Sequence, residues 1–143
     1  MPYVALAALL EAHQQDLAQR LFEVVRVYHP DQAFLDQHHE QLLVRYEGCI
    51  LAIATYLRDG DATLYKEFLV QFSHQVFRNR GTVEVMQICT QAIADQMKEL
   101  VDLNFAELHH ERIRASYKRR IDSFLTLTNV TAINARITKN PGT

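Results

Sequence analysis

The sequence predicts an all-α fold, and three features of the chain predict it. Glycine and proline, which interrupt helices, number only four and three, and neither occurs between Gly81 and Pro141. An interval without strong breakers favours long helices over short strands. The β-branched residues do not cluster into alternating runs of the kind that form strands. Apolar residues instead recur at intervals of three and four, the spacing of one helical face.

The amino-terminal half predicts two long helices. The first runs from about Val4 to Tyr28 and ends before Pro30, because the residue that precedes a proline disfavours helical geometry. The second begins near Asp31, whose carboxylate can cap the free amides of the first turn. It ends at Gly60, which can adopt the left-handed conformation that terminates many helices.

The carboxyl-terminal half predicts two more helices and a long last one. The third follows Asp61, which can cap it, and ends at Gly81. Thr82 is the expected cap of the fourth, which extends to Val101. A break near residues 102–104 is expected before the last helix. One bent helix is the alternative, because neither glycine nor proline stands there.

Length, charge and cysteine usage indicate one domain in the cytoplasm. The 143 residues are enough for a single core, and residues 139–143 are expected to form a frayed tail. With a net charge of −2 and a pI near 6.4, no overall field favours nucleic acid or an anionic membrane. Cys49 and Cys89 form no CxxC pair and no signal peptide is recognisable, which favours a reducing compartment.

His74 is the strongest candidate for a cofactor ligand. It stands on the predicted third helix among aromatic residues. An axial haem ligand of this kind is an imidazole in an apolar pocket. A histidine near the carboxyl end of a helix also interacts favourably with the helix dipole, and this structural interpretation is the more common one. Haem binding through His74 is therefore the alternative, and the primary expectation is no cofactor.

The other polar groups predict neither catalysis nor a metal site. Glu107 and His110 have the Glu-x-x-His spacing of di-iron bundles, but such bundles need the motif twice and it occurs once. His38 and His39 lack further ligands at helical spacing. Cys49 and Cys89 stand beside isoleucines, which is typical of inert core thiols. The sequence therefore predicts a protein that is not an enzyme.

Two segments resemble a known sensor family. YLRDGDATLYKEFLVQFSHQVFRNRGTVEVMQICTQAIADQMKELV, Tyr56 to Val101, has a helix ending in an acidic turn, a helix ending in an arginine-rich turn with glycine, and the helix start TVEVM. With LLEAHQQDLAQRLFEVV, Leu9 to Val25, it resembles the N-terminal sensor domain of stressosome proteins of the RsbR/RsbRD type, a non-haem globin family. The resemblance implies a globin-like bundle of five or six helices without haem, paired as a dimer.

The same resemblance implies a role in bacterial stress signalling. In that family the domain precedes a STAS domain that controls a kinase and, through it, a sigma factor. These 143 residues include no STAS segment, so the downstream partner stays open.

A second resemblance concerns the end of the chain. SYKRRIDSFLTLTNVTAINARI, Ser116 to Ile137, resembles the last helix of globin-coupled sensors, and His74 lies roughly where their haem-ligating histidine would be. Seven residues lead from His74 to Gly81, more than the tight turn of that family. The two resemblances agree on the fold and differ on the cofactor.

A ligand pocket is expected where the third and fourth helices cross. Its candidate lining residues are Phe68, Phe72, Met86, Cys89 and Ile93. A filled core without a ligand is the alternative.

The last helix carries an apolar stripe that is wider than one partner helix covers. A self-complementary surface closes by two-fold symmetry, so the stripe predicts a homodimer built on the fourth and last helices. Tyr117, Ile121 and Phe124 are expected near the axis. The alternative is that the stripe completes the core of the monomer.

These expectations together predict a non-enzymatic sensory or regulatory domain that transmits a signal through helix movement in a dimer. Its expected partner is a regulatory protein, such as a STAS domain or kinase, rather than nucleic acid or membrane. The alternatives are a haem-binding gas or redox sensor and a plain oligomerisation module.

Overall fold

The computed structural model describes residues 2–29, 31–75 and 82–139, including all of their side chains except those of residues 72–75, 82–83 and 131–139. These residues form α-helices, one short 3-10 helix and no strand, so the all-α prediction is confirmed. The elements are α1 (Val4–Ala12), α2 (Gln14–Tyr28), α3 (Gln32–Gln37), α4 (His39–Asp59), α5 (Thr63–Gln75), α6 (Thr82–Asn104), η1 (Leu108–His110) and α7 (Glu111–Lys139). Across the described ranges, no helix combines the length and apolar character needed to cross a membrane.

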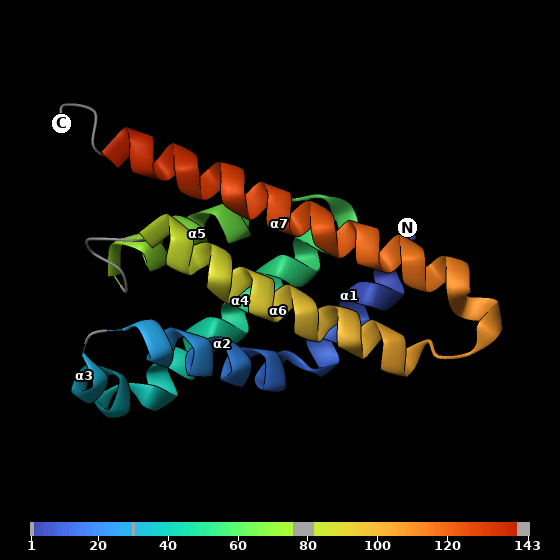
Figure 1. The fold of residues 1–143 in the computed structure, drawn as a ribbon, viewed down its shortest axis with the longest axis horizontal. Helices are drawn as coiled ribbons and strands as arrows, with labels where there is room; N and C mark the ends of the chain where they lie inside the picture. Colours follow the sequence, from blue (N-terminus) through green and yellow to red (C-terminus); the bar gives the residue numbers. More distant parts are fainter. Residues whose placement is uncertain (1, 30, 76–81, 140–143) are drawn as a thin grey trace.

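The helices pack around one core. Figure 1 shows α6 and α7 as an antiparallel pair that is joined at one end of the molecule, with the carboxyl end of α7 at the other. Helix α6 also packs on α2, while α4 packs on α1, α2 and α5. Helix α5 lies against α7 and α4.

Each of the two helices predicted in the amino-terminal half is divided into two. The backbone leaves helical geometry at His13 (φ −111°, ψ 21°) and, almost identically, at His38 (φ −109°, ψ 20°). The amide of His38 still donates to the carbonyl of Phe34, over 3.0 Å, so the chain turns without losing this bond. Neither position carries a glycine or proline, which is why helix-breaker usage did not predict these bends.

The predicted caps of the second and third helices are confirmed. The Asp31 carboxylate accepts a hydrogen bond from the amide of Phe34 over 2.9 Å, and Gly60 has a φ of 83°. The Asp61 carboxylate accepts from the amide of Thr63 over 3.1 Å, and this bond lowers the pKa of Asp61. The predicted helix end at Gly81 lies outside the described residues, as do residues 140–143 of the predicted tail; Lys139 is still helical.

The predicted break between the last two helices exists but lies slightly later. Helix α6 continues through Asn104, and the chain turns at residues 105–107. Arg114 of α7 donates to the carbonyl oxygens of Phe105 and, over 2.8 Å, Glu107. The amide of His110 also donates to the Glu107 carbonyl, over 2.9 Å. These bonds satisfy carbonyls that the turn would otherwise leave free.

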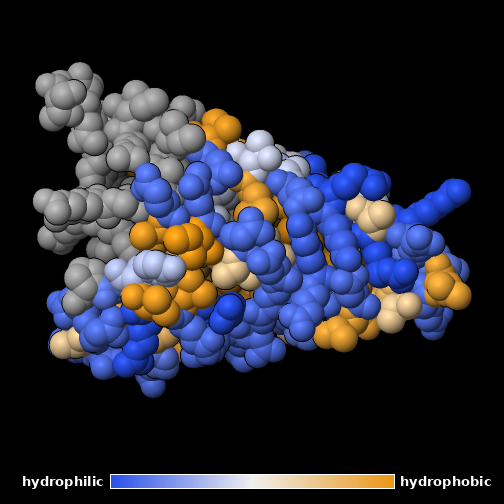
Figure 2. All heavy atoms as spheres, viewed as in Figure 1, coloured by the Kyte–Doolittle hydropathy of each residue, from blue (hydrophilic) through white to orange (hydrophobic). Residues whose placement is uncertain are grey.

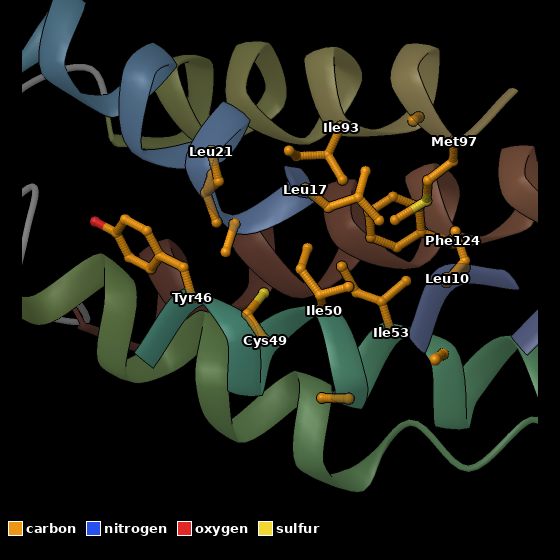
Figure 3. Packing of buried hydrophobic residues seen from close by; sticks show 14 of the residues in the cluster. Leu10, Leu17, Leu21, Tyr46, Cys49, Ile50, Ile53, Ile93, Met97 and Phe124 are labelled. Carbon is orange, nitrogen blue, oxygen red and sulfur yellow. The ribbon is translucent and has the colours of Figure 1, made fainter. Parts of the chain in front are cut away.

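The buried residues form one hydrophobic cluster to which every α-helix from α1 to α7 contributes. Figure 3 shows Ile50 and Ile53 of α4 pointing toward Leu17 of α2, with Ile93 and Met97 of α6 on the far side of this layer. Burying one such side chain fully stabilises the fold by about 1.5–3 kcal/mol relative to leaving it in water.

The middle of the stripe on α7 belongs to this core, which corrects the prediction for the dimer axis, whereas Leu108 and Ile113 at its start are exposed. Tyr117, Ile121 and Phe124 are only 7%, 0% and 0% exposed in the single chain. The stripe is wide because α4, α5 and α6 of the same chain share it. These three side chains therefore offer no surface to a second copy. The face of the molecule seen in Figure 2 is mostly hydrophilic, with separate small hydrophobic patches.

Candidate functional site

An apolar cavity lies where α2, α4, α5, α6 and α7 meet. Its volume is about 20 Å³. A cavity of roughly 10–15 Å³, measured in the same way, can hold one water, so this cavity has room for about one. The lining residues are Leu21, Cys49, Ile50, Ile53, Tyr65, Phe68, Leu69, Met86, Cys89, Thr90, Ile93 and Phe124. Figure 3 shows Ile50 and Ile53 of α4 on one side of this region and Ile93 of α6 on the other, with Leu21 and Phe124 between them.

The structure places four of the five predicted pocket residues at this cavity: Phe68, Met86, Cys89 and Ile93. The side chain of Phe72, on α5, lies outside the described residues. That a ligand occupies the cavity stays a prediction. The walls that α2, α4 and α7 contribute are not predicted by the sequence, because helical periodicity marks an apolar face without saying which other helix covers it.

Tyr65, in the wall of the cavity, forms a buried polar pair with Thr128. The hydroxyls of Tyr65 on α5 and Thr128 on α7 are 2.7 Å apart. Thr128 donates its own proton to the carbonyl of Phe124, over 2.8 Å, so Tyr65 is the donor to Thr128. Burial raises the pKa of Tyr65 well above its ordinary value, which keeps the phenol protonated. This hydrogen bond ties α5 to α7 beside the cavity.

Both cysteine thiols line the same cavity, and both are expected to be unreactive. Cys49 and Cys89 are free thiols and buried. Burial raises the pKa of Cys89 to about 12 and also raises that of Cys49. Because the thiolate is the nucleophile, thiols that stay protonated at neutral pH react slowly. This is the behaviour that the flanking isoleucines predict.

The cavity beside α5 is smaller than a haem. His74 stands on α5, but its side chain lies outside the described residues. Sites for cofactors and drug-sized ligands enclose roughly 300–1,000 Å³. The cavity beside α5 is far smaller, and the rings of Tyr65 and Phe124 pack at 5.3 Å in its wall. A haem would enter only if these helices moved apart.

The other predicted polar groups lie elsewhere and have different surroundings. His38 Nδ1 lies 2.9 Å from Gln41 Oε1, and the ring of His39 meets the edge of Phe22 at 4.6 Å. The first contact is local to the α3–α4 bend, and the second joins α4 to α2. At the α6–α7 corner, Glu107 and His110 lie together with His109, which the sequence pattern did not include in a ligand set.

Comparison with known proteins adds no family to this geometry. No family model matches the chain, and neither a curated protein nor a solved structure matches it significantly.

Proposed function

We propose that this chain is a non-enzymatic sensory or regulatory domain whose input is a small apolar molecule in the cavity beside α5. The observation that carries the proposal is the composition of the cavity wall. Tyr65 and Phe68 of α5 and Phe124 of α7 line the same space. The space holds about one water, so an apolar molecule of the size of xenon or benzene would fit only when α5 moves away from α7. This movement of the helices is the output.

The resemblance to the stressosome sensor family supports the biological setting. On that basis the domain is a globin-like bundle in the bacterial cytoplasm that signals to a STAS-type or kinase partner of a sigma-factor pathway. The buried, protonated thiols of Cys49 and Cys89 support a role in binding rather than in covalent chemistry.

The size of the cavity favours the cofactor-free interpretation over the haem-binding one. The test is titration of the full chain with haemin. We expect no Soret shift typical of a ligated haem. A Soret band that disappears in the His74→Ala variant would contradict the proposal and support a haem sensor.

Ligand binding is tested by thermal denaturation in the presence of xenon, chloroform or benzene. We expect at least one of these molecules to raise the Tm of the wild type. Ile93→Phe places a larger side chain in the cavity wall and should abolish the rise. The matched control, Ile88→Phe, changes a residue of α6 that is 42% exposed and should respond as the wild type does. A wild type that responds to no probe would indicate a filled core and contradict the proposal.

Dimerisation is part of this proposal. Its interface must lie away from Tyr117, Ile121 and Phe124, because the single chain buries these residues. Sedimentation at micromolar concentration tests it, and a mass of 16.6 kDa would rule out the dimer. Ile121→Glu is not a suitable probe of the interface. It places an unpaired charge in the core of the monomer and should unfold the chain.

A further inference from the structure

Three potential ligands gather at the corner that joins α6 to α7. One ligand atom from each of Glu107, His109 and His110 lies within 4.8 Å of the other two. His109 Nδ1 is 3.2 Å from a Glu107 carboxylate oxygen, and the two imidazole rings have centroids 4.0 Å apart. Donors in tetrahedral zinc sites are about 3.3–3.6 Å apart, given metal–ligand bonds of 2.0–2.2 Å. Small side-chain rotations would therefore complete a three-ligand set.

The backbone that carries these ligands is held in place. Arg114 donates to the carbonyls of Phe105 and Glu107, and the His110 amide donates to the Glu107 carbonyl. The ring of Phe105 meets His110 edge-on at 5.7 Å and Tyr117 edge-on at 5.3 Å. A ligand set on a supported turn loses less freedom on binding than one on an unsupported loop.

One ring nitrogen of His110 lacks a hydrogen-bond partner. Its Nδ1 atom is buried and has no hydrogen-bond partner among the described residues. Buried polar atoms are normally satisfied by protein, water or an ion, so one without a protein partner needs an explanation. By contrast, the carboxylate of Glu107 and the ring of His109 are 72% and 68% exposed, which leaves the site open to solutes.

We propose that Glu107, His109 and His110 bind one divalent transition-metal ion of the zinc or nickel class, with water in the remaining positions. Two imidazoles and a carboxylate suit such ions, whereas Mg²⁺ and Ca²⁺ prefer ligand sets made only of oxygen. The corner lies at the end of the molecule away from α5 (Figure 1), so this proposal is independent of the cavity.

The experiment is calorimetric titration of the tag-free full chain with Zn²⁺, and separately with Ni²⁺ and Mg²⁺. We expect one Zn²⁺ or Ni²⁺ per chain and no binding of Mg²⁺. Glu107→Gln, His109→Gln and His110→Gln should each weaken Zn²⁺ binding at least tenfold. A chain that binds neither Zn²⁺ nor Ni²⁺ would overturn the proposal.

The matched control is the double variant His38→Gln, His39→Gln. It removes the other pair of adjacent histidines, which also stands where two helices meet, and should keep the affinity of the wild type. Loss of affinity in this control equal to that in His109→Gln would overturn the assignment. So would binding that survives the combined His109→Gln and His110→Gln changes.

A second measurement does not depend on variants. Trace Cu²⁺ should broaden the NMR ring signals of His109 and His110 before those of the other five histidines. Broadening that begins elsewhere would contradict the site.

Discussion

At the ends of α4 and α6, an arginine of α7 donates hydrogen bonds to backbone carbonyls, but only α4 ends at a glycine. At the end of α4, Gly60 adopts a φ of 83° and its amide donates to the Tyr56 carbonyl over 2.8 Å. Arg120 donates to the carbonyls of Leu57, over 2.9 Å, and Tyr56, over 3.1 Å. At the end of α6, Arg114 donates to the carbonyls of Phe105 and Glu107. This turn has no residue in left-handed geometry, since Gly60 is the only described residue with a positive φ.

The difference shows two ways to end a helix. The end of α4 is specified by a local residue, Gly60, which tolerates left-handed geometry. Its free carbonyls are then bound by Arg120, which lies more than 60 residues later in the sequence. The end of α6 has no such local signal and depends on a side chain that becomes available only when α7 folds back. The following variants test this contrast, from the largest expected effect to the smallest.

Arg120→Met should have the largest effect, a loss of about 3 kcal/mol in the free energy of unfolding. It removes two charge-assisted hydrogen bonds to carbonyls and the cation–π contacts with Tyr3 and Tyr56, at 4.8 and 5.2 Å. Urea denaturation measures it. Arg119→Met, at the exposed neighbouring position, is the control and should stay within about 0.5 kcal/mol of the wild type. Equal losses in both variants would refute a specific role for Arg120.

Arg114→Met should cost about 2 kcal/mol, because the carbonyls of Phe105 and Glu107 lose their charged donor at a turn without glycine. Hydrogen exchange should also speed up at the amides of residues 105–110, while the amides around Gly60 keep their protection. Arg112→Met, an exposed neighbour on the same helix, is the control. If the corner amides keep wild-type protection in Arg114→Met, the turn does not depend on this side chain.

Gly60→Ala should cost about 1 kcal/mol, because a side chain in left-handed geometry is strained. The added Cβ would lie 3.7 Å from Arg120 Nη2, an ordinary contact, so the loss arises from the backbone. Gly48→Ala, inside α4 where the new Cβ meets nothing within 4 Å, should instead stabilise the chain by about 0.5–1 kcal/mol. Thermal denaturation of both variants should give shifts of opposite sign. Shifts of the same sign would contradict the claim that the left-handed geometry of Gly60 ends α4.

Lys118→Met should have the smallest effect, below about 1 kcal/mol. Lys118 forms an ion pair with Asp102 across α6 and α7 at 2.6 Å, and both side chains are partly exposed. The difference from wild type should vanish in 1 M NaCl, where the screening length is about 3 Å. Lys66→Met, at an exposed position of α5, is the control. A loss that persists at high salt would show that packing, rather than charge, joins the helices here.

Much of the fold was predictable because its signals are short-range. The stop at Gly60 and the caps Asp31 and Asp61 act through bonds to residues at most four positions away, and the structure shows them as expected. The bends at His13 and His38 escaped prediction because no residue type there forces the backbone out of a helix. The two helices that meet at His13, α1 and α2, both pack on α4 and α6, whereas α3 and α4, which meet at His38, pack on each other.

The candidate sites divide in the same way. Periodicity placed Phe68, Met86, Cys89 and Ile93 on apolar faces, and the structure brings them to one cavity. It also marks Phe124 as apolar, but the prediction that this residue lies at a dimer axis is wrong, because the single chain buries it. A stripe on one helix does not reveal whether the same chain or a second one covers it.

The sequence by itself determined the helical class, the caps and which faces are apolar, since these depend on residue type and on neighbours within about one helical turn. The tertiary structure alone decided that α4, α5 and α6 cover the stripe of α7, that Arg114 and Arg120 reach distant carbonyls, and that His109 joins Glu107 and His110 at one corner. These contacts depend on how whole helices fold back on one another, and spacing along a single helix does not encode that.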